Sequence, residues 1–292
     1  MSPLSLGIQT LFALIAFAGN SVLCRLALQD NAIDPNSFTI IRLSSGALIL
    51  CVLMALQLKS LQFISRPSLG RLKQASFLFI YAACFSFAYV LLGTAAGALL
   101  LFVTVQLTML LTQYLQGRRS TGLELFGLCL ALGSFMIWMG PNASRPDLTG
   151  ALLMVAAGIA WAFYTIAGKQ SQQPQLDTAQ NFLFSLCFIV ILMPIYLWQN
   201  TLNLSYNGIL LAISSGAITS GLGYWLWYRV LPAFSSLSAG VMQLSVPILA
   251  AAGGFIWNQE QVTMTFILAS SGILGGIFLV LYSAHLASKR TH

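Results

Sequence analysis

Three amide side chains stand out because each lies within an apolar stretch of the chain. Asn20, Gln106 and Gln243 occupy runs without Asp, Glu, Lys or Arg. A polar side chain at the depth of a bilayer is costly, so it is a candidate functional residue by default. These amides could hydrogen-bond a carboxylate or an ammonium group of a small solute. The alternative is that they join helices, a contribution of only about 0.6 kcal/mol on average.

Aromatic residues form a second set of candidates. Tyr81 and Phe85 lie four residues apart and Trp161 and Tyr164 three apart, spacings that place each pair on one face of a helix. Tyr224 is a further candidate in the second half of the chain. Such rings can stack against an apolar solute, although aromatic stripes also face lipid or pack in cores. Tyr81 and Trp161 lie deeper than the other tryptophans, which are near the ends of predicted spans, and this depth favours the wall of a cavity.

The scarcity of charge limits the solutes that such a cavity could take. No Asp or Glu lies in the middle of an apolar run, whereas a cation/proton antiporter would need a carboxylate there. A carrier of phosphorylated sugars would need several basic side chains. Only Arg42 lies within reach of the predicted cavity, since Arg25 and Lys169 lie at run ends where their stems can snorkel. The class of solute that is not excluded is neutral or zwitterionic, and amphipathic.

Enzymatic chemistry has little support in the sequence. The chain has two histidines, His285 and His292, and both lie near its end, away from any buried nucleophile. No GxSxG motif is present. The five cysteines show no CxxC spacing, so they do not indicate a metal or disulfide framework. We therefore expect no catalytic residues, no metal and no cofactor.

The elements that hold these residues are predicted to be membrane-spanning helices. The chain of 292 residues is 58% hydrophobic and 7% charged, whereas a soluble domain has about 25% charged residues. A span needs roughly 20 apolar residues, and in hydrocarbon its backbone must bond internally as a helix. Breaks at 93–97 and 199–208 divide the two longest runs, which predicts ten spans. The charge-free runs cover 1–24, 43–58, 74–117, 125–144, 148–168, 178–228, 230–259 and 261–288.

The distribution of basic residues predicts the orientation. With ten spans both termini share one side, and placing them in the cytoplasm puts ten of the 13 Lys and Arg residues inside. This is a strong positive-inside bias. It also accounts for the net charge of +7 without a nucleic-acid partner. We expect a multi-pass protein whose first span is retained. Only Arg25, Arg42 and Arg145 fall towards the outside.

Two short segments suggest an internal duplication. "FAGNSVLCR" at 17–25 and "WAFYTIAGK" at 161–169 share an aromatic residue followed by a basic one eight places later, and the two copies are 144 residues apart (169 − 25). A unit of five helices is odd, so its second copy would enter the membrane inverted. Inverted repeats are typical of secondary transporters, with the substrate site where the halves meet. We predict an all-α integral membrane fold of two inverted five-helix repeats, 1–140 and 147–288, around a central cavity. The alternative is that unrelated helical bundles share small and aromatic residues.

These features resemble the ten-helix, EamA-type members of the drug/metabolite transporter superfamily over nearly the whole chain. "WAFYTIAGK" resembles the first helix of a repeat, "TIIRLSSGALIL" (39–50) the Arg-containing second helix, and "SVPILAAAGGFIWNQE" (245–260) the Pro-containing fourth helix. The first half departs from the pattern, with Phe17 in the place of Trp and Arg118 in the place of Glu. Tyr81 and Trp161 match cavity positions of bacterial aromatic amino-acid exporters of the YddG type.

The resemblance implies a secondary transporter in the bacterial inner membrane that exports, or facilitates diffusion of, neutral and in particular aromatic amino acids by alternating access. Exporters of other amphipathic metabolites or drugs, a channel and a scramblase are the alternatives. We expect helix bends at Pro194 and Pro247, because proline removes a helical hydrogen bond. Gly19 is a third expected bend, because glycine allows the backbone to flex. The partners implied are a small-molecule substrate and the lipid bilayer; no oligomer is required. The candidate cavity residues are Asn20, Arg42, Tyr81, Phe85, Gln106, Trp161, Tyr164, Tyr224 and Gln243.

Overall fold

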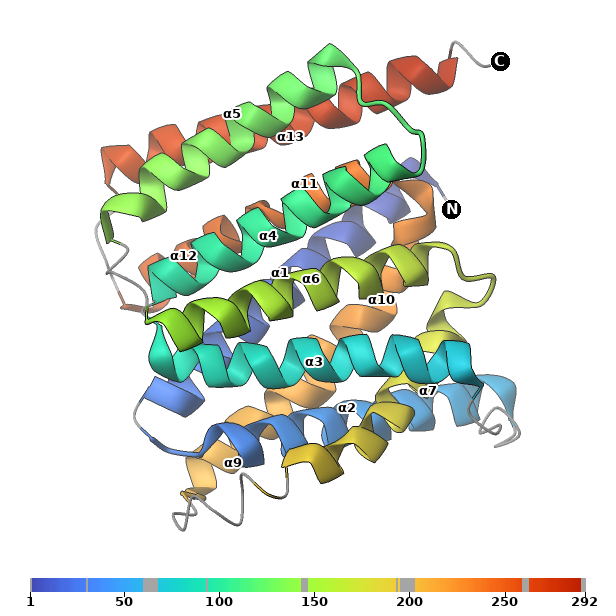
Figure 1. Ribbon diagram of the computed structural model, residues 1–292, viewed down its shortest axis with the longest axis vertical. Coiled ribbons are helices and arrows are strands. Elements are labelled where there is room, and N and C mark those ends of the chain that lie inside the picture. Colours follow the sequence, from blue (N-terminus) through green and yellow to red (C-terminus); the bar gives the residue numbers. More distant parts are fainter. Residues whose placement is uncertain are drawn as a thin grey trace.

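The computed structural model is a bundle of long, roughly aligned helices (Figure 1). It describes residues 2–29, 31–59, 68–92, 94–142, 147–192, 194, 203–258 and 263–289. Within these ranges the only β pairing is an isolated bridge between Ile33 and Leu204. The helices of the first half are α1 (Pro3–Gln29), α2 (Pro35–Leu58), α3 (Leu69–Leu91), α4 (Thr94–Leu115), α5 (Gly122–Met139) and the short 3₁₀ helix η1 (Gly140–Asn142).

The second half contains more interruptions than the first. Its regular helices are α6 (Leu148–Lys169), α7 (Pro174–Ser185), α9 (Tyr206–Ser214), α10 (Gly223–Val230), α11 (Ser236–Gln243), α12 (Ser245–Asn258) and α13 (Met264–Lys289). Between them lie the 3₁₀ helices η2 (Leu186–Leu192) and η4 (Leu231–Ala233), and the π-helix η3 (Ser215–Leu222).

Side-chain caps define several helix starts. The Asp34 carboxylate accepts the Ser37 N–H at 2.9 Å before α2, and Asp147 caps α6 in the same way. At α5 the Thr121 hydroxyl accepts the Glu124 N–H while the Glu124 carboxylate accepts the Thr121 N–H, a capping box. Such caps satisfy N–H groups that have no partner inside the helix.

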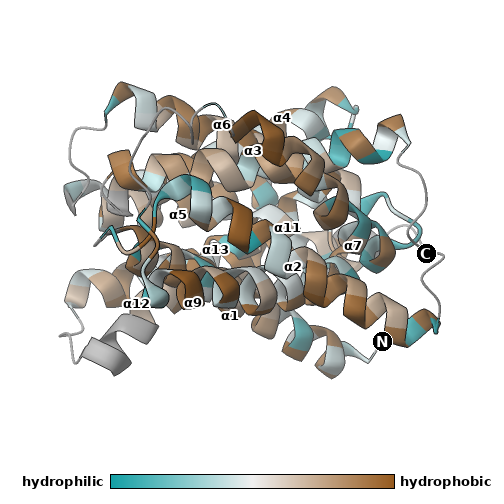
Figure 2. Ribbon diagram, turned by 90° about the horizontal axis from the view of Figure 1, so that it is seen from below, coloured by the Kyte–Doolittle hydropathy of each residue, from teal (hydrophilic) through white to brown (hydrophobic). Residues whose placement is uncertain are grey.

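The chain is an all-α integral membrane protein. Nine described helical segments are long and apolar enough to cross a membrane, and one of them is the interrupted stretch from Tyr206 to Ala233. The ninth predicted span, in the run 230–259, corresponds to α11 and α12, which are interrupted at Leu244. Many large apolar side chains are exposed, as a lipid-facing surface requires. The hydropathy colouring of the ribbon shows hydrophobic residues along most of the helices (Figure 2).

The helix pair α5 and α13 forms one edge of the bundle (Figure 1). Small residues permit this contact, since an added Cβ on Gly276 would lie 2.4 Å from the Gly127 carbonyl oxygen. Small residues at such contacts are typical of packing between membrane-spanning helices. The rest of the bundle holds the pocket-forming helices α1, α3, α4, α6, α10, α11 and α12.

A π-helical segment in the eighth span was not predicted. In η3 the backbone of Gly216 approaches α2 so closely that a Cβ would lie 2.2 Å from the Arg42 carbonyl oxygen. The wider π turn carries Ser215 and Ser220, which hydrogen-bond side chains of neighbouring helices. Such single π segments occur frequently at functional sites.

The start of α1 and the end of α13 lie at the same end of the bundle (Figure 1). Near the opposite end, the segment before α2 and the segment before α9 are joined by two backbone hydrogen bonds, Asp34 N–H to Asn203 O at 3.1 Å and Ser205 N–H to Ala32 O at 2.9 Å. Which end faces the cytoplasm, and the division of the chain into repeats 1–140 and 147–288, remain predictions.

Candidate functional site

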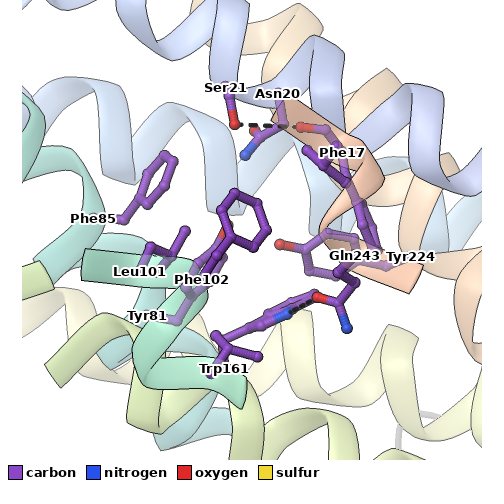
Figure 3. A pocket seen from close by; sticks show the side chains of 12 residues that line it. Phe17, Asn20, Ser21, Tyr81, Phe85, Leu101, Phe102, Trp161, Tyr224 and Gln243 are labelled. Carbon is purple, nitrogen blue, oxygen red and sulfur yellow. Dashed lines mark hydrogen bonds between the residues drawn. The ribbon is translucent and has the colours of Figure 1, made fainter. Parts of the chain in front are cut away.

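A small, partly enclosed pocket lies among helices from both halves of the chain (Figure 3). Helices α1, α3 and α4 supply most of its wall, and α6, α10, α11 and α12 supply the remainder. Its lining is mainly aromatic and aliphatic, with a few polar groups. The residues are Phe17, Asn20, Ser21, Tyr81, Phe85, Leu101, Phe102, Val105, Trp161, Tyr224, Gln243 and Val246.

Trp161 is at the centre of the aromatic wall. The centroid of its ring system lies 4.8 Å from that of Tyr81, 5.0 Å from Tyr224 and 5.5 Å from Phe17. The ring of Phe17 is also nearly perpendicular to that of Tyr224, at 5.5 Å. Edge-to-face and tilted contacts of this kind hold the rings rigidly. Four helices thus combine to present one preorganised aromatic surface to the pocket.

A hydrogen bond fixes the position of Trp161. Its indole Nε1–H donates to the Gln243 Oε1 at 2.5 Å, and Gln243 Nε2 donates to the Ala239 carbonyl oxygen at 3.2 Å. Both side chains are at least 95% buried. The amide of Gln243 therefore joins α6 to α11 and also lines the pocket. The two interpretations made from the sequence, a cavity residue and a residue that joins helices, are compatible for Gln243.

Asn20 lies on the opposite side of the pocket from Trp161 (Figure 3). Its Oδ1 accepts hydrogen bonds from the Ser215 hydroxyl at 2.8 Å and from the Ser220 hydroxyl at 3.4 Å. Because both serines belong to η3, the π-helical segment holds this amide in place. The pocket thus has an amide on each of two facing walls.

Arg42 lies directly behind this wall and does not line the pocket. Its Nε–H donates to Ser220 Oγ at 3.0 Å and its Nη2 donates to Tyr224 Oη at 3.3 Å. The guanidinium carbon lies 5.4 Å from the Tyr81 ring centroid and 5.9 Å from that of Phe85. Three of its neighbours therefore line the pocket, but Arg42 itself is buried, with 1% of its surface exposed.

Gln106 and Tyr164 are also buried outside the pocket lining. The amide of Gln106 faces α11, where a Cβ on Gly240 would lie 2.9 Å from its Oε1. Neither amide atom of Gln106 has a hydrogen-bond partner within the described part of the chain. Tyr164 packs behind the aromatic wall, with its ring 6.0 Å from Trp161 and 5.2 Å from Tyr228.

The structure thus brings six of the nine predicted cavity residues to one pocket. The other three, Arg42, Gln106 and Tyr164, are buried in the layer around it. Prediction from sequence missed several lining residues. Phe17 could have been predicted, because it occupies the aromatic position of the repeated segment. Nothing in the sequence distinguished the aliphatic lining residues from other aliphatic residues. The six predicted residues in the lining are Asn20, Tyr81, Phe85, Trp161, Tyr224 and Gln243.

The predicted bends differ in their local structure. Helix α1 continues unbroken through Gly19, whose added Cβ would lie 3.1 Å from Thr219 Cγ2, so this glycine permits close packing. Pro247 lies in the first turn of α12, three residues after the interruption at Leu244. Pro194 follows η2, and the residues on both sides of it lie outside the described ranges. A hinge function at these positions remains a prediction.

The bundle and its pocket define a class of protein. The described residues contain no group of three metal-binding side chains, and the pocket lining contains no histidine, cysteine or carboxylate. Spanning helices that enclose an apolar pocket with a few convergent polar groups are typical of membrane transporters for small solutes.

Comparison with known proteins agrees with this class. The sequence profile of the EamA-like transporter family matches residues 148–282. The chain is 45% identical to the uncharacterized protein PA1977 of Pseudomonas aeruginosa, with 93% of each chain covered. It belongs to the EamA-like transporters of the drug/metabolite transporter superfamily, so it is a transporter and not an enzyme.

More distant relatives carry functional names. The chain is 30% identical to the threonine/homoserine exporter RhtA of Salmonella typhimurium over 48% of each chain, and 24% identical to the uncharacterized transporter YoaV of Bacillus subtilis over 61% of this chain and 62% of YoaV. A solved crystal structure superimposes with a TM-score of 0.81 at 17% identity, covering 96% of this chain and 98% of that one. That structure supports the fold.

Proposed function

We propose that this transporter exports neutral amino acids with large apolar, in particular aromatic, side chains by alternating access. The observation that carries the proposal is the pocket wall built around Trp161, with the amides of Asn20 and Gln243 on facing sides. Rings of Tyr81 and Tyr224 extend the wall on either side of Trp161. An aromatic surface suits the side chain of the solute, and the amides suit its polar end.

The named relative supports export of amino acids, since RhtA is described as a threonine/homoserine exporter. The match covers about half of each chain, and the pocket here is richer in rings than small hydroxyl-bearing solutes need. We therefore place aromatic amino acids first. Threonine and homoserine are the second candidates, because the two amides could bind any amino acid.

The proposed route fits two inverted five-helix repeats, 1–140 and 147–288, in a bacterial inner membrane with both termini in the cytoplasm. The pocket supports this arrangement because α1, α3 and α4 from the first repeat and α6, α10, α11 and α12 from the second all contribute to it. In an inverted repeat, opening of one half towards one side pairs with closing of the other.

An efflux assay tests the proposal. Cells that express the protein and are preloaded with labelled phenylalanine or tyrosine should release the label faster than cells with an empty vector. Trp161→Ala should return release to the vector rate, because it removes the ring that contacts three others and lines the pocket.

Trp138→Ala is the matched control, since Trp138 packs edge-to-face against Phe266 between α5 and α13 and does not line the pocket. It should retain most of the efflux. Release no faster than the vector across all twenty amino acids would contradict the proposed cargo. Release that fails to saturate would instead favour a channel, and phospholipid movement between leaflets would favour a scramblase.

A further inference from the structure

Arg42 carries a positive charge in the interior of the bundle, and it has no acidic partner among the described residues. The whole chain has six Asp and Glu residues, and no described residue forms an ion pair with Arg42. The ion pair found among the described residues joins Arg71 to Asp177, at 3.9 Å and partly exposed. A buried charge is strongly disfavoured unless it is paired and fully hydrogen-bonded. An uncompensated charge that persists in such a place therefore indicates a function.

The contacts that Arg42 does make are all to neutral groups. Ser220 and Tyr224 each accept one hydrogen bond, and the rings of Tyr81 and Phe85 lie near the guanidinium. Cation–π contacts contribute on the order of 0.5–2 kcal/mol each, well below the desolvation penalty of an ion. The buried Nη1 has no hydrogen-bond partner among the described residues. Part of the guanidinium is thus available to an anion.

One layer of side chains separates this guanidinium from the pocket. Tyr81, Phe85 and Tyr224 contact Arg42 on one side and line the pocket on the other. Ser220 links Arg42 to the amide of Asn20, another lining residue. Tyr81 and Tyr224 therefore lie between the guanidinium and the pocket.

We propose that Arg42 binds the carboxylate of the transported solute, and that Tyr81 and Tyr224 cover it in the conformation described here. The inference rests on the proposed function of the pocket as the solute's route. A guanidinium presents two parallel N–H donors that match the two oxygens of a carboxylate. The pocket lining itself has no basic residue, so Arg42 alone would face the solute, and this charge balance favours a single negative charge over a phosphate ester.

Ligands that differ in one charged group test the proposal. Phenylalanine without its ammonium group is 3-phenylpropanoate, and phenylalanine without its carboxylate is phenethylamine. Each is titrated into the purified full-length protein in detergent, and the dissociation constant is measured by calorimetry. We expect 3-phenylpropanoate to bind roughly ten- to a hundredfold more tightly than phenethylamine, the range of a charge-assisted hydrogen-bonded pair.

Arg42→Gln should remove this preference, and Arg42→Lys should retain part of it, because lysine keeps the charge without the two parallel donors. Arg229→Gln is the matched control: Arg229 is exposed on α10 and does not line this pocket, so binding should stay as in the wild type. If Arg42→Gln does not fold, the comparison of the two ligands on the wild-type protein and on Arg42→Lys still decides.

Equal binding of the two ligands, or an unchanged preference in Arg42→Gln, would overturn the proposal and assign Arg42 a packing role. The two proposals can fail separately. Tight, Arg42-dependent binding of 3-phenylpropanoate without efflux of any amino acid would retain the carboxylate site and reject amino-acid export. Amino-acid efflux that is independent of Arg42 would do the reverse.

Discussion

At the scale of single residues, the hydrogen bond between the side chains of Trp161 and Gln243 positions the indole ring on which the proposed site depends. The indole N–H has a buried acceptor, and the acceptor's own N–H bonds the backbone of α11. A buried donor that loses its acceptor incurs a desolvation penalty of about 1–3 kcal/mol. The pair therefore both stabilises the fold and orients the pocket wall.

A double-mutant cycle tests this pair. Gln243→Leu should lower the free energy of unfolding by about 1–3 kcal/mol, because it leaves the Trp161 N–H unsatisfied. In a Trp161→Phe background the same change should cost less, by about 1 kcal/mol, because no N–H remains to be satisfied. Unfolding of the four proteins in mild detergent with added denaturant measures both. Equal effects in the two backgrounds would show that the bond contributes nothing.

Residue types and depth were enough to predict six of the side chains that line the pocket, but not which way each side chain turns. Asn20 and Gln243 face the pocket, whereas Gln106, which has the same chemistry and depth, faces α11 instead. The difference is the rotation of α4 about its axis, which depends on packing against a glycine of another helix. Neither the rotation of a helix about its axis nor the helix it packs against can be predicted from local sequence.

At the scale of elements, the π-helical segment η3 is the feature that local pattern could not predict. It carries Ser215 and Ser220, which hydrogen-bond Asn20 of the pocket lining, and it packs Gly216 and Gly221 against α2. Hydropathy predicted one span here, and one span is found, from Tyr206 to Ala233. The wider turn results from tertiary contacts between helices, since propensity within the segment is neutral on the choice between α and π.

Substitution of Gly216 tests whether this close approach matters. Gly216→Ala should lower the apparent melting temperature in detergent by several degrees, since the new Cβ would lie 2.0 Å from Ser45 Oγ and 2.2 Å from a backbone oxygen of α2. Overpacking of this kind typically costs about 1–3 kcal/mol. Gly133→Ala is the control, because no atom lies within 4 Å of its Cβ position. Equal melting temperatures for the two variants would contradict the described packing.

At the scale of the whole molecule, composition and hydropathy were sufficient for the fold class and nearly sufficient for the number of spans. The bilayer makes this possible, because each crossing requires a long apolar helix. The ninth span is the exception in detail, since its helix is interrupted at Leu244, close to Pro247. Pairings such as α5 with α13 depend on contacts between distant segments, which a single sequence does not contain.

The central claim is that the pocket is the route of the solute, open to each side of the membrane in turn. Ser21 is a suitable reporter because it lines the pocket and is a small residue on α1. Exposed native cysteines, Cys129 and Cys187, would first be replaced by serine.

In that background, the rate at which a small thiol reagent labels Ser21→Cys is the most direct measurement. The account predicts that labelling proceeds from either side of the membrane and slows at least severalfold at a phenylalanine concentration that saturates efflux. A labelling rate that phenylalanine leaves unchanged while efflux is saturated would contradict it.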